Sequence, residues 1–198
     1  RCVLMREGRN VMAGGPDQVI AAYLADGASG NRVYEGEALP SGASITRIEV
    51  VTSEPNATHV HGRPMQVRFD VNVPAPLGWG VFSFQIHNEL MQPIVHLWLF
   101  DAERPFARVP GRHTLVCDIP RLRLYLGRYT VTAHISDGYR GGYFQTVESV
   151  CPFEVVMHGH ERDWPWEEGT CQYLEETRWN VVPLPPDVPA DGNAVVNA

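Results

Sequence analysis

The sequence predicts an all-β fold, a sandwich or barrel of short antiparallel strands, on three observations. The 198 residues include 18 glycines and 16 prolines, which favour short strands and many turns over long helices. Apolar stretches follow one another at roughly ten-residue spacing between residues 45 and 156, as they do in antiparallel sandwiches and barrels. Several of them alternate apolar and polar residues with a period of two, the pattern of a strand with one buried face.

The first 26 residues predict a small α/β unit. Two short apolar stretches, 2–5 and 10–13, flank Gly8 and predict two strands joined by a turn. Pro16 and Asp17 then stand where a helix start prefers them, at the beginning of a helix over 17–24. Residues 27–44 are rich in glycine, serine and alanine without any period, and we expect a linker there.

The body of the chain, residues 45–156, contains eight candidate strands. They are 45–51, 57–62, 65–73, 80–88, 94–100, 113–120, 128–136 and 149–156. The stretch 65–73 alternates most clearly, with Met, Val, Phe, Val and Val on one side and Gln, Arg, Asp and Asn on the other. Eight such strands separated by Pro, Gly or Asn turns predict one antiparallel core.

The strand pattern fades after residue 156. Residues 157–198 form an irregular tail in which only 170–179 could be a strand. The end, 183–198, has too few apolar residues to offset the cost of ordering, and we expect it to be disordered.

Composition excludes several classes of function. The net charge is −7, whereas nucleic acid or anionic membrane as the main partner requires a concentrated basic surface. All 16 basic residues are arginine, so a phosphate loop with its lysine cannot form within this chain. Four cysteines are scattered singly, which favours reduced thiols over two disulfides.

The N-terminal unit resembles the last segment of an ABC transporter ATPase domain. The matching residues are Cys2, Gly8, Gly15, Pro16, Val19 and Tyr23. The resemblance implies that residues 1–26 are the C-terminal remnant of such a domain. The phosphate loop, signature and catalytic carboxylate that would precede it are not in this sequence, so the chain itself is not expected to be an enzyme.

The body resembles the C-terminal carbohydrate-binding domain of Wzt-type proteins, the ATP-binding subunits of ABC exporters for O-antigen and related polysaccharides. The matching stretches are Gly62–Phe69, Phe84–Asn88, Ile119–Ile135 and the PFEVV of 152–156. The two resemblances together cover about residues 1–156, in the order that such proteins have them.

The resemblance implies an eight-stranded antiparallel jelly-roll sandwich over 45–156 that binds the exported glycan, often near its modified non-reducing end. It places the protein in the cytoplasm, peripheral to the inner membrane through the transporter complex. The implied partners are the glycan, a second copy of the chain and, through the missing ATPase domain, the transmembrane subunit. No cofactor is implied, and residues 170–179 would be a strand exchanged in the homodimer.

A jelly roll also predicts a binding face. The second, fourth, fifth and seventh predicted strands would share a sheet. In three of these strands, 80–88, 94–100 and 128–136, the period of two indicates which side chains point outward. These are Ser83, Gln85, His87, His96, Trp98, Thr130, Thr132, His134 and Ser136. Hydroxyl, amide and imidazole groups suit sugar hydroxyls, and Trp98 offers a plate for a sugar C–H face. Arg68, Arg128 or Arg140 could pair with an acidic cap.

Alternatives remain for several of these residues. A one-residue register shift would bury Trp98 in the core, and the three histidines could simply belong to a solvated sheet face. Arg68 and Asp70 suit a solvated face or a cross-strand pair equally. The tryptophans of 164–166 could be a sugar platform or part of a tail packed on the sandwich.

Two other functions compete with glycan binding. His59 and His61 have the HxH spacing of cupin-type metal enzymes, but no glutamate follows before Glu89, and His158 and His160 are no better placed. A purely structural or dimerisation domain would need an apolar outer face, whereas the strands predict a polar one with a single aromatic residue.

Overall fold

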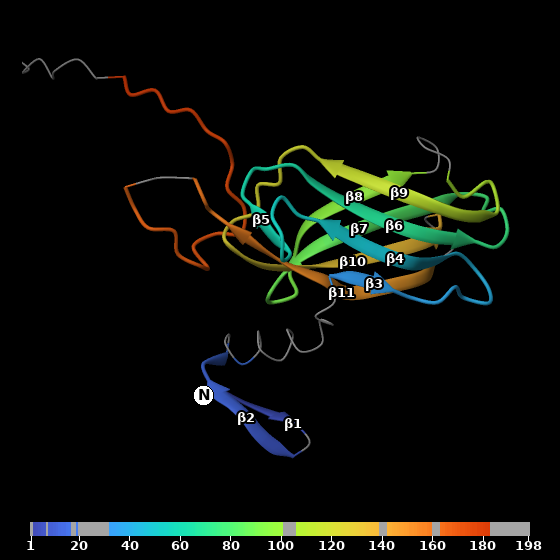
Figure 1. Ribbon diagram of the computed structural model, residues 1–198, viewed down its shortest axis with the longest axis horizontal. Coiled ribbons are helices and arrows are strands. Elements are labelled where there is room, and N and C mark those ends of the chain that lie inside the picture. The colour runs from blue at the N-terminus through green and yellow to red at the C-terminus, as the bar shows by residue number, and fades with distance from the viewer. Residues whose placement is uncertain are drawn as a thin grey trace, which may run out of the picture.

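The computed structural model describes residues 2–6, 8–16, 19, 32–100, 106–138, 142–159 and 163–182. Strands are the main regular elements among these residues, and Figure 1 shows their arrangement. The strands are β1 (Cys2–Arg6), β2 (Arg9–Gly14), β3 (Val33–Glu35), β4 (Ser44–Val51), β5 (Thr58–Val60), β6 (Met65–Val73), β7 (Gly80–Asn88), β8 (Pro93–Phe100), β9 (Gly111–Ile119), β10 (Gly127–Asp137) and β11 (Tyr143–Val156).

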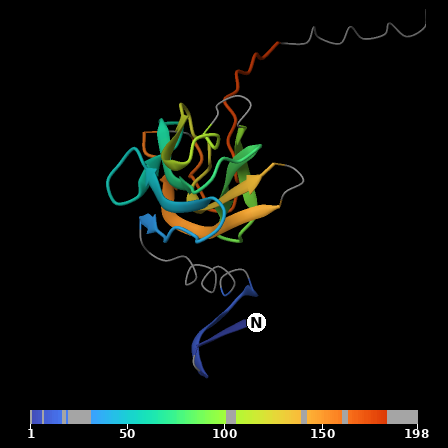
Figure 2. The same ribbon diagram turned by 90° about the vertical axis from the view of Figure 1, so that its right-hand side faces the viewer.

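Two sheets face each other and form a β-sandwich, as the sequence predicts. One has the strand order β5-β11-β10-β7-β8 and the other β3-β4-β6-β9. The end-on view of Figure 2 shows the two layers. The described part of the sandwich therefore has nine strands instead of eight, because β3 forms within the stretch expected to be a linker.

The last strand lies in a different sheet from the one that a jelly roll would give it. A jelly roll pairs it with the sheet of β4, β6 and β9, but β11 pairs with β10 on one side and, in parallel, with β5 on the other. The opposed orders β4-β6-β9 and β11-β10-β7 correspond to strands A-B-E and G-F-C of an immunoglobulin-like sandwich. The expectation of a jelly-roll order is corrected accordingly.

The start of β10 has a feature typical of that topology. The Tyr129 side chain is buried, and its hydroxyl donates to the backbone carbonyl of Tyr125 at 2.9 Å. A tyrosine near the start of strand F that bonds to the backbone a few residues upstream is the tyrosine corner of immunoglobulin-like domains. It fixes the turn at Gly127, where a positive φ of 153° suits glycine.

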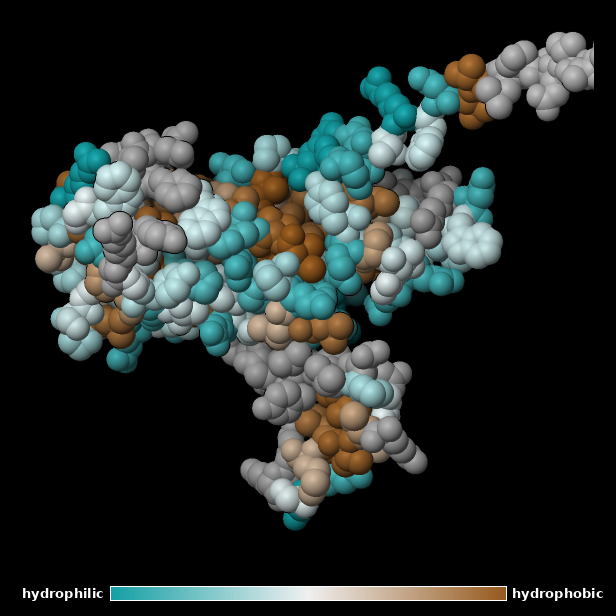
Figure 3. Space-filling model, turned by 180° about the vertical axis from the view of Figure 1, so that it is seen from behind, coloured by the Kyte–Doolittle hydropathy of each residue, from teal (hydrophilic) through white to brown (hydrophobic). Residues whose placement is uncertain are grey.

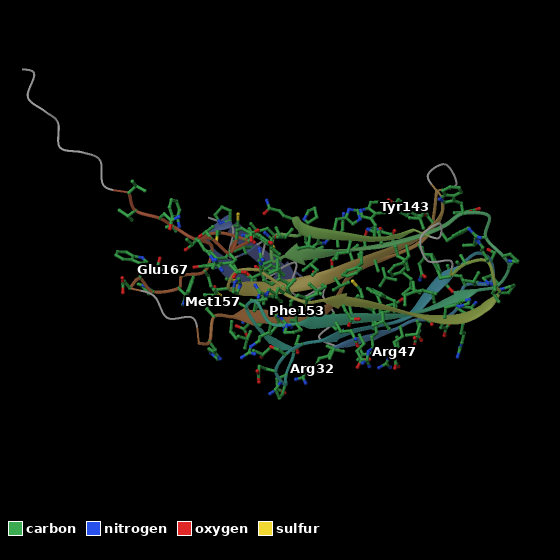
Figure 4. The ribbon with its side chains drawn as sticks, turned by 90° about the horizontal axis from the view of Figure 1, so that it is seen from above. Arg32, Arg47, Tyr143, Phe153, Met157 and Glu167 are labelled. Atoms are coloured by element: carbon green, nitrogen blue, oxygen red, sulfur yellow. The ribbon has the colours of Figure 1, made fainter. Side chains whose placement is uncertain are left out.

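The core fills the space between the two sheets. Phe69 of β6 lies with its ring centroid 4.7 Å from Phe82 and 5.0 Å from Phe84 of β7. Phe153 of β11 stacks on Tyr129 at 5.8 Å and lies between the layers in Figure 4. All four cysteines are free thiols, so packing and hydrogen bonds hold the sandwich together without a disulfide.

The N-terminal strands form the expected hairpin, turning at Gly8 with φ 76°. Figure 1 shows this hairpin apart from the sandwich. The expected helix over 17–24 falls outside the described residues, apart from Val19, whose amide donates to the Gly15 carbonyl at 3.1 Å.

The tail beyond β11 packs back on its own chain. Leu124 and Tyr173 form an antiparallel bridge, and the Tyr125 amide donates to the Gln172 carbonyl at 3.0 Å. Trp166 contacts Tyr125 edge-to-face at 5.8 Å, whereas Trp164 is 71% exposed. The stretch 183–198, expected to be disordered, lies outside the described residues.

Membrane-spanning helices were also sought among the described residues. No helix there has the length and apolar character needed to cross a bilayer.

Candidate functional site

The outer face of the five-stranded sheet carries all nine residues that the sequence selects as a binding face. β7 lies between β8 and β10, and the pairing registers align these residues across the three strands. His134, Ser83 and Trp98 form one row, Thr132, Gln85 and His96 form the next, and Thr130 lies opposite His87. Ser136, near the end of β10, lies opposite Val81.

These residues differ in how much water reaches them. Trp98 is 50% exposed and His96 is also exposed, which rules out the register shift that would bury Trp98. Gln85, Thr130 and His134 are half-buried. Ser83, His87, Thr132 and Ser136 are buried, so they form the floor between the taller side chains. The Thr130 hydroxyl is buried with no hydrogen-bond partner among the described residues.

A chain of hydrogen bonds connects four strands across this face. The Ser149 amide donates to Thr132 Oγ1 at 3.2 Å, and Thr132 Oγ1 lies 3.2 Å from His87 Nδ1. His87 Nε2 is 2.9 Å from Gln85 Oε1, and Gln85 Nε2 is 3.5 Å from His96 Nδ1. The chain runs from β11 through β10 and β7 to β8 and holds the side chains in register with one another.

Aromatic rings stand at both sides of this face. The indole of Trp98 packs on the His96 ring with the centroids 4.3 Å apart. On β11, Tyr143 is 68% exposed and lies 5.2 Å from the His134 ring, and Figure 4 shows it near one end of the sandwich. The face therefore offers two exposed aromatic surfaces with polar groups between them.

β11 contributes site residues that the sequence does not reveal. Thr146 Oγ1 lies 3.1 Å from His134 Nδ1, and Glu148 interacts electrostatically with His87 and His134. Their stretch, 143–148, precedes the predicted last strand. The buried residues of β11 are Val147, Val150, Cys151, Phe153 and Val155, so the alternation is irregular before Cys151 and regular only from there to Val155.

Two β-bulges cause this spacing. Val131 and Ala133 of β10 pair with Val150 and Val147, so β11 has one extra residue there, and a second extra residue precedes Phe153. Ser149 and Cys151 have positive φ values of 56° and 53°, which non-glycine residues adopt at a cost. The first bulge turns the Ser149 amide toward Thr132, where the hydrogen-bond chain begins.

The histidines of this face are held in the uncharged form. Burial lowers the pKa of His87, against the opposing effect of Glu148, and His96 lowers it further. Burial likewise lowers the pKa of His134, and the neighbouring His96 and His87 add to this effect. The pKa of His96 is also lowered by burial. The face therefore presents neutral imidazoles at pH 7.

The three arginines considered for an acidic cap are not placed together. Arg68 lies on the outer face of the other sheet, where its Nε donates to Gln66 Oε1 at 2.5 Å. Arg128 is exposed at the start of β10, with its Nε 4.0 Å from Glu89 Oε1. Arg140 lies outside the described residues. Asp70 accepts from Thr114 Oγ1 at 2.7 Å, a cross-strand contact of the second sheet, whose outer side also carries Arg47 (Figure 4).

The rings of His59 and His61 make hydrogen bonds to backbone groups of the protein. The buried His59 accepts from the Ser53 amide through Nδ1 at 3.2 Å, and His61 Nδ1 lies 2.7 Å from the Leu124 carbonyl oxygen. Within the described ranges, no three His, Cys, Asp or Glu side chains come close enough together to hold a metal ion. His160 lies outside those ranges. The metal-enzyme alternative gains no support from this arrangement.

A cavity of about 410 Å³ opens at the edge of the sandwich where β8 and β9 are not paired with each other. Its lining includes Phe69, Phe82, Leu97, Leu115 and Trp98. Figure 3, seen from the side of the five-stranded sheet, shows an apolar area in the middle of the molecule, surrounded by hydrophilic residues. The polar outer face thus adjoins an apolar cavity at Trp98.

Sequence comparison identifies the family of this chain. A family profile described as the Wzt C-terminal domain matches residues 40–171. The chain belongs to the Wzt C-terminal domain family. The family is a non-catalytic domain of an ABC transporter subunit, consistent with the resemblance that the sequence shows.

One solved structure agrees with the fold of a Wzt C-terminal domain. The crystal structure of "the C-terminal domain of wzt" superposes with a TM-score of 0.56 at 12% identity, over 76% of this chain and 87% of that one. The alkylpurine DNA glycosylase AlkC of Pseudomonas fluorescens has a TM-score of only 0.35 at 13% identity, covering 58% of this chain and 30% of that one. Among curated proteins, none matches the sequence.

Proposed function

We propose that this Wzt C-terminal domain is the carbohydrate-binding module of an ABC polysaccharide exporter. It would bind an O-antigen-like glycan, near the modified non-reducing end, on the cytoplasmic side of the inner membrane. The observation that supports this most directly is the outer face of β8, β7 and β10, where nine hydroxyl, amide, imidazole and indole side chains are aligned. Sugars need such donors and acceptors beside an aromatic plate.

The remaining partners are part of the same proposal. Residues 1–26 would be the end of the ATPase domain, through which the module is attached to the transmembrane subunit. The exposure of Val3, Met5 and Val11 on the β1–β2 hairpin supports this, since apolar side chains of that kind suit packing against a larger domain. A homodimer would form with the tail of each copy contacting the other.

A glycan-binding measurement on purified protein tests the proposed site. We expect the polysaccharide of the source organism to bind, and Trp98→Ala to weaken binding at least about tenfold through loss of the stacking plate. Trp179→Ala is the matched control, because Trp179 is 88% exposed in the tail and lies outside the face. Calorimetric titration measures both variants.

The outcomes separate binding from a scaffolding role. If the polysaccharide does not bind, a domain that only dimerises the transporter becomes the better explanation. If it binds and Trp98→Ala leaves the affinity unchanged, glycan recognition is retained but its site lies elsewhere.

A further inference from the structure

In the hydrogen-bond chain on the binding face, the donor and the acceptor of each bond can be assigned. It starts at the Ser149 amide, which can only donate, so Thr132 Oγ1 accepts there. Gln85 Oε1 can only accept, so His87 Nε2 carries a proton. A neutral imidazole has one N–H, and His87 Nδ1 therefore accepts from the Thr132 hydroxyl.

The same reasoning fixes the proton on His96. The amide nitrogen of Gln85 donates to His96 Nδ1, which must be unprotonated. The neutral ring of His96 then carries its proton on Nε2. Because His96 is exposed and packs against Trp98, this N–H donor stands beside the aromatic plate.

The charge near these donors is negative. Glu148 of β11 is exposed and acts electrostatically on both His87 and His134. Arg128 lies beyond Thr130 at the start of β10, next to Glu89. The face thus combines uncharged donors with one carboxylate, an arrangement that suits hydroxyl or carbonyl oxygens and repels a carboxylate or phosphate.

We propose that this surface selects uncharged sugar units over acidic ones, and that Thr132 is the positioning residue that fixes the donor on His96 through His87 and Gln85. The inference rests on the proposed function, since it assumes that the face binds glycan. It adds the chemical class of the sugar and the residue that sets the donor pattern.

Binding to paired oligosaccharides tests the selectivity. Each pair has a neutral pyranose oligomer and the same oligomer oxidised to a carboxylate at C6, and a library of such pairs is titrated against the protein. We expect the neutral members to bind at least about fivefold more tightly at low salt, with a smaller difference at high salt. Glu148→Gln should reduce the difference by strengthening binding of the oxidised members.

Nitrogen-15 spectra of the histidine rings test the donor chain without any ligand. The wild-type protein should have His87 and His96 protonated on Nε2. Gln85→Glu keeps the shape of the side chain but replaces the amide donor that faces His96 Nδ1 with a carboxylate oxygen, which only accepts. The His96 ring should then carry its proton on Nδ1. Thr132→Val should disturb the His87 tautomer and weaken neutral-glycan binding about threefold to tenfold, whereas Thr132→Ser should restore both.

The outcomes distinguish this inference from the function on which it rests. Oxidised oligomers that bind as tightly as their neutral partners, or more tightly, overturn the selectivity while glycan binding stands. A wild-type His96 protonated on Nδ1, or a Gln85→Glu spectrum identical to wild type, overturns the role of the chain. If no pair binds and the source polysaccharide does not bind either, the proposed function fails together with the selectivity.

Discussion

Tyr129 shows how one side chain determines the geometry around the site. Its ring stacks in the core, and its hydroxyl closes the turn that leads into β10, the strand that carries four of the face residues. Burial raises the pKa of its phenol well above the ordinary value, so the group remains a donor at any physiological pH. The position of the face therefore depends on one buried hydrogen bond.

Tyr129→Phe should destabilise the domain by about 1 kcal/mol, because it removes the donor to the Tyr125 carbonyl and keeps the ring. Urea unfolding followed by tryptophan fluorescence measures the change. Tyr173→Phe is the control, since that hydroxyl is on an exposed tail residue 3.4 Å from Glu175. Equal stability of Tyr129→Phe and wild type would show that the corner does not contribute.

Residue-level prediction from the sequence is successful where alternation is regular. In β7 and β10 the period of two places Gln85, Thr132 and His134 on the outward side, where the structure has them. In β11 three register shifts interrupt the alternation, so Tyr143, Thr146 and Glu148 are missed. The two bulges of β11 require positive φ values at Ser149 and Cys151. Serine and cysteine do not favour such values, so the sequence gives no signal for the bulges.

At the scale of elements, strand positions are predicted well and sheet membership is not. The ends of β6 and β7 match the predicted ranges, since turn residues border both strands. The assignment of β11 depends on contacts distant in sequence. Its Gln145 accepts from the Ile45 amide at 2.6 Å and its Cys151 thiol donates to the Ile48 carbonyl at 3.3 Å, so it touches β4 while pairing with β10.

The tail segment 170–176 is an element whose contribution can be measured. The Leu174 amide donates to the Arg123 carbonyl at 3.0 Å, and Arg121 and Arg123 form ion pairs with Glu175 and Glu176. A chain ending at residue 162 should lose roughly 2–4 kcal/mol of stability, because these bonds disappear and the buried Leu124 and Tyr125 become exposed.

A chain ending at residue 182 is the control for this truncation and should unfold at the wild-type urea concentration. Gel filtration of both chains also tests the exchanged dimer, because the same tail contacts made between two copies would join them. A dimer that persists after truncation at 162 would exclude the tail as its cause. Unchanged stability of the shorter chain would show that the docked tail adds nothing.

At the scale of the whole molecule, the buried and half-buried histidines make stability depend on pH. Burial lowers the pKa of His59, His87 and His134 below the ordinary 6.5. The unfolded chain therefore takes up protons first as the pH falls below 6.5, and folding stability decreases in that range. Above it both states are neutral at these sites, and their contribution no longer changes.

Urea midpoints measured from about pH 7.5 down to about pH 5.5 should fall, and His59→Gln should reduce the slope because it removes one of the titrating groups. His158→Gln, at an exposed position after β11, should leave the slope unchanged. A midpoint that rises on acidification would contradict the direction of these pKa shifts.

The bulges of β11 also constrain how its gene can change. Loss of a single codon between Val147 and Val150 would remove the extra residue of the first bulge and, with it, the backbone turn that brings the Ser149 amide to Thr132 Oγ1. Substitutions within this stretch leave its length unchanged and are compatible with the same pairing of β11 with β10. In related genes we therefore expect its length to be invariant while its residues vary, the reverse of what surface loops show.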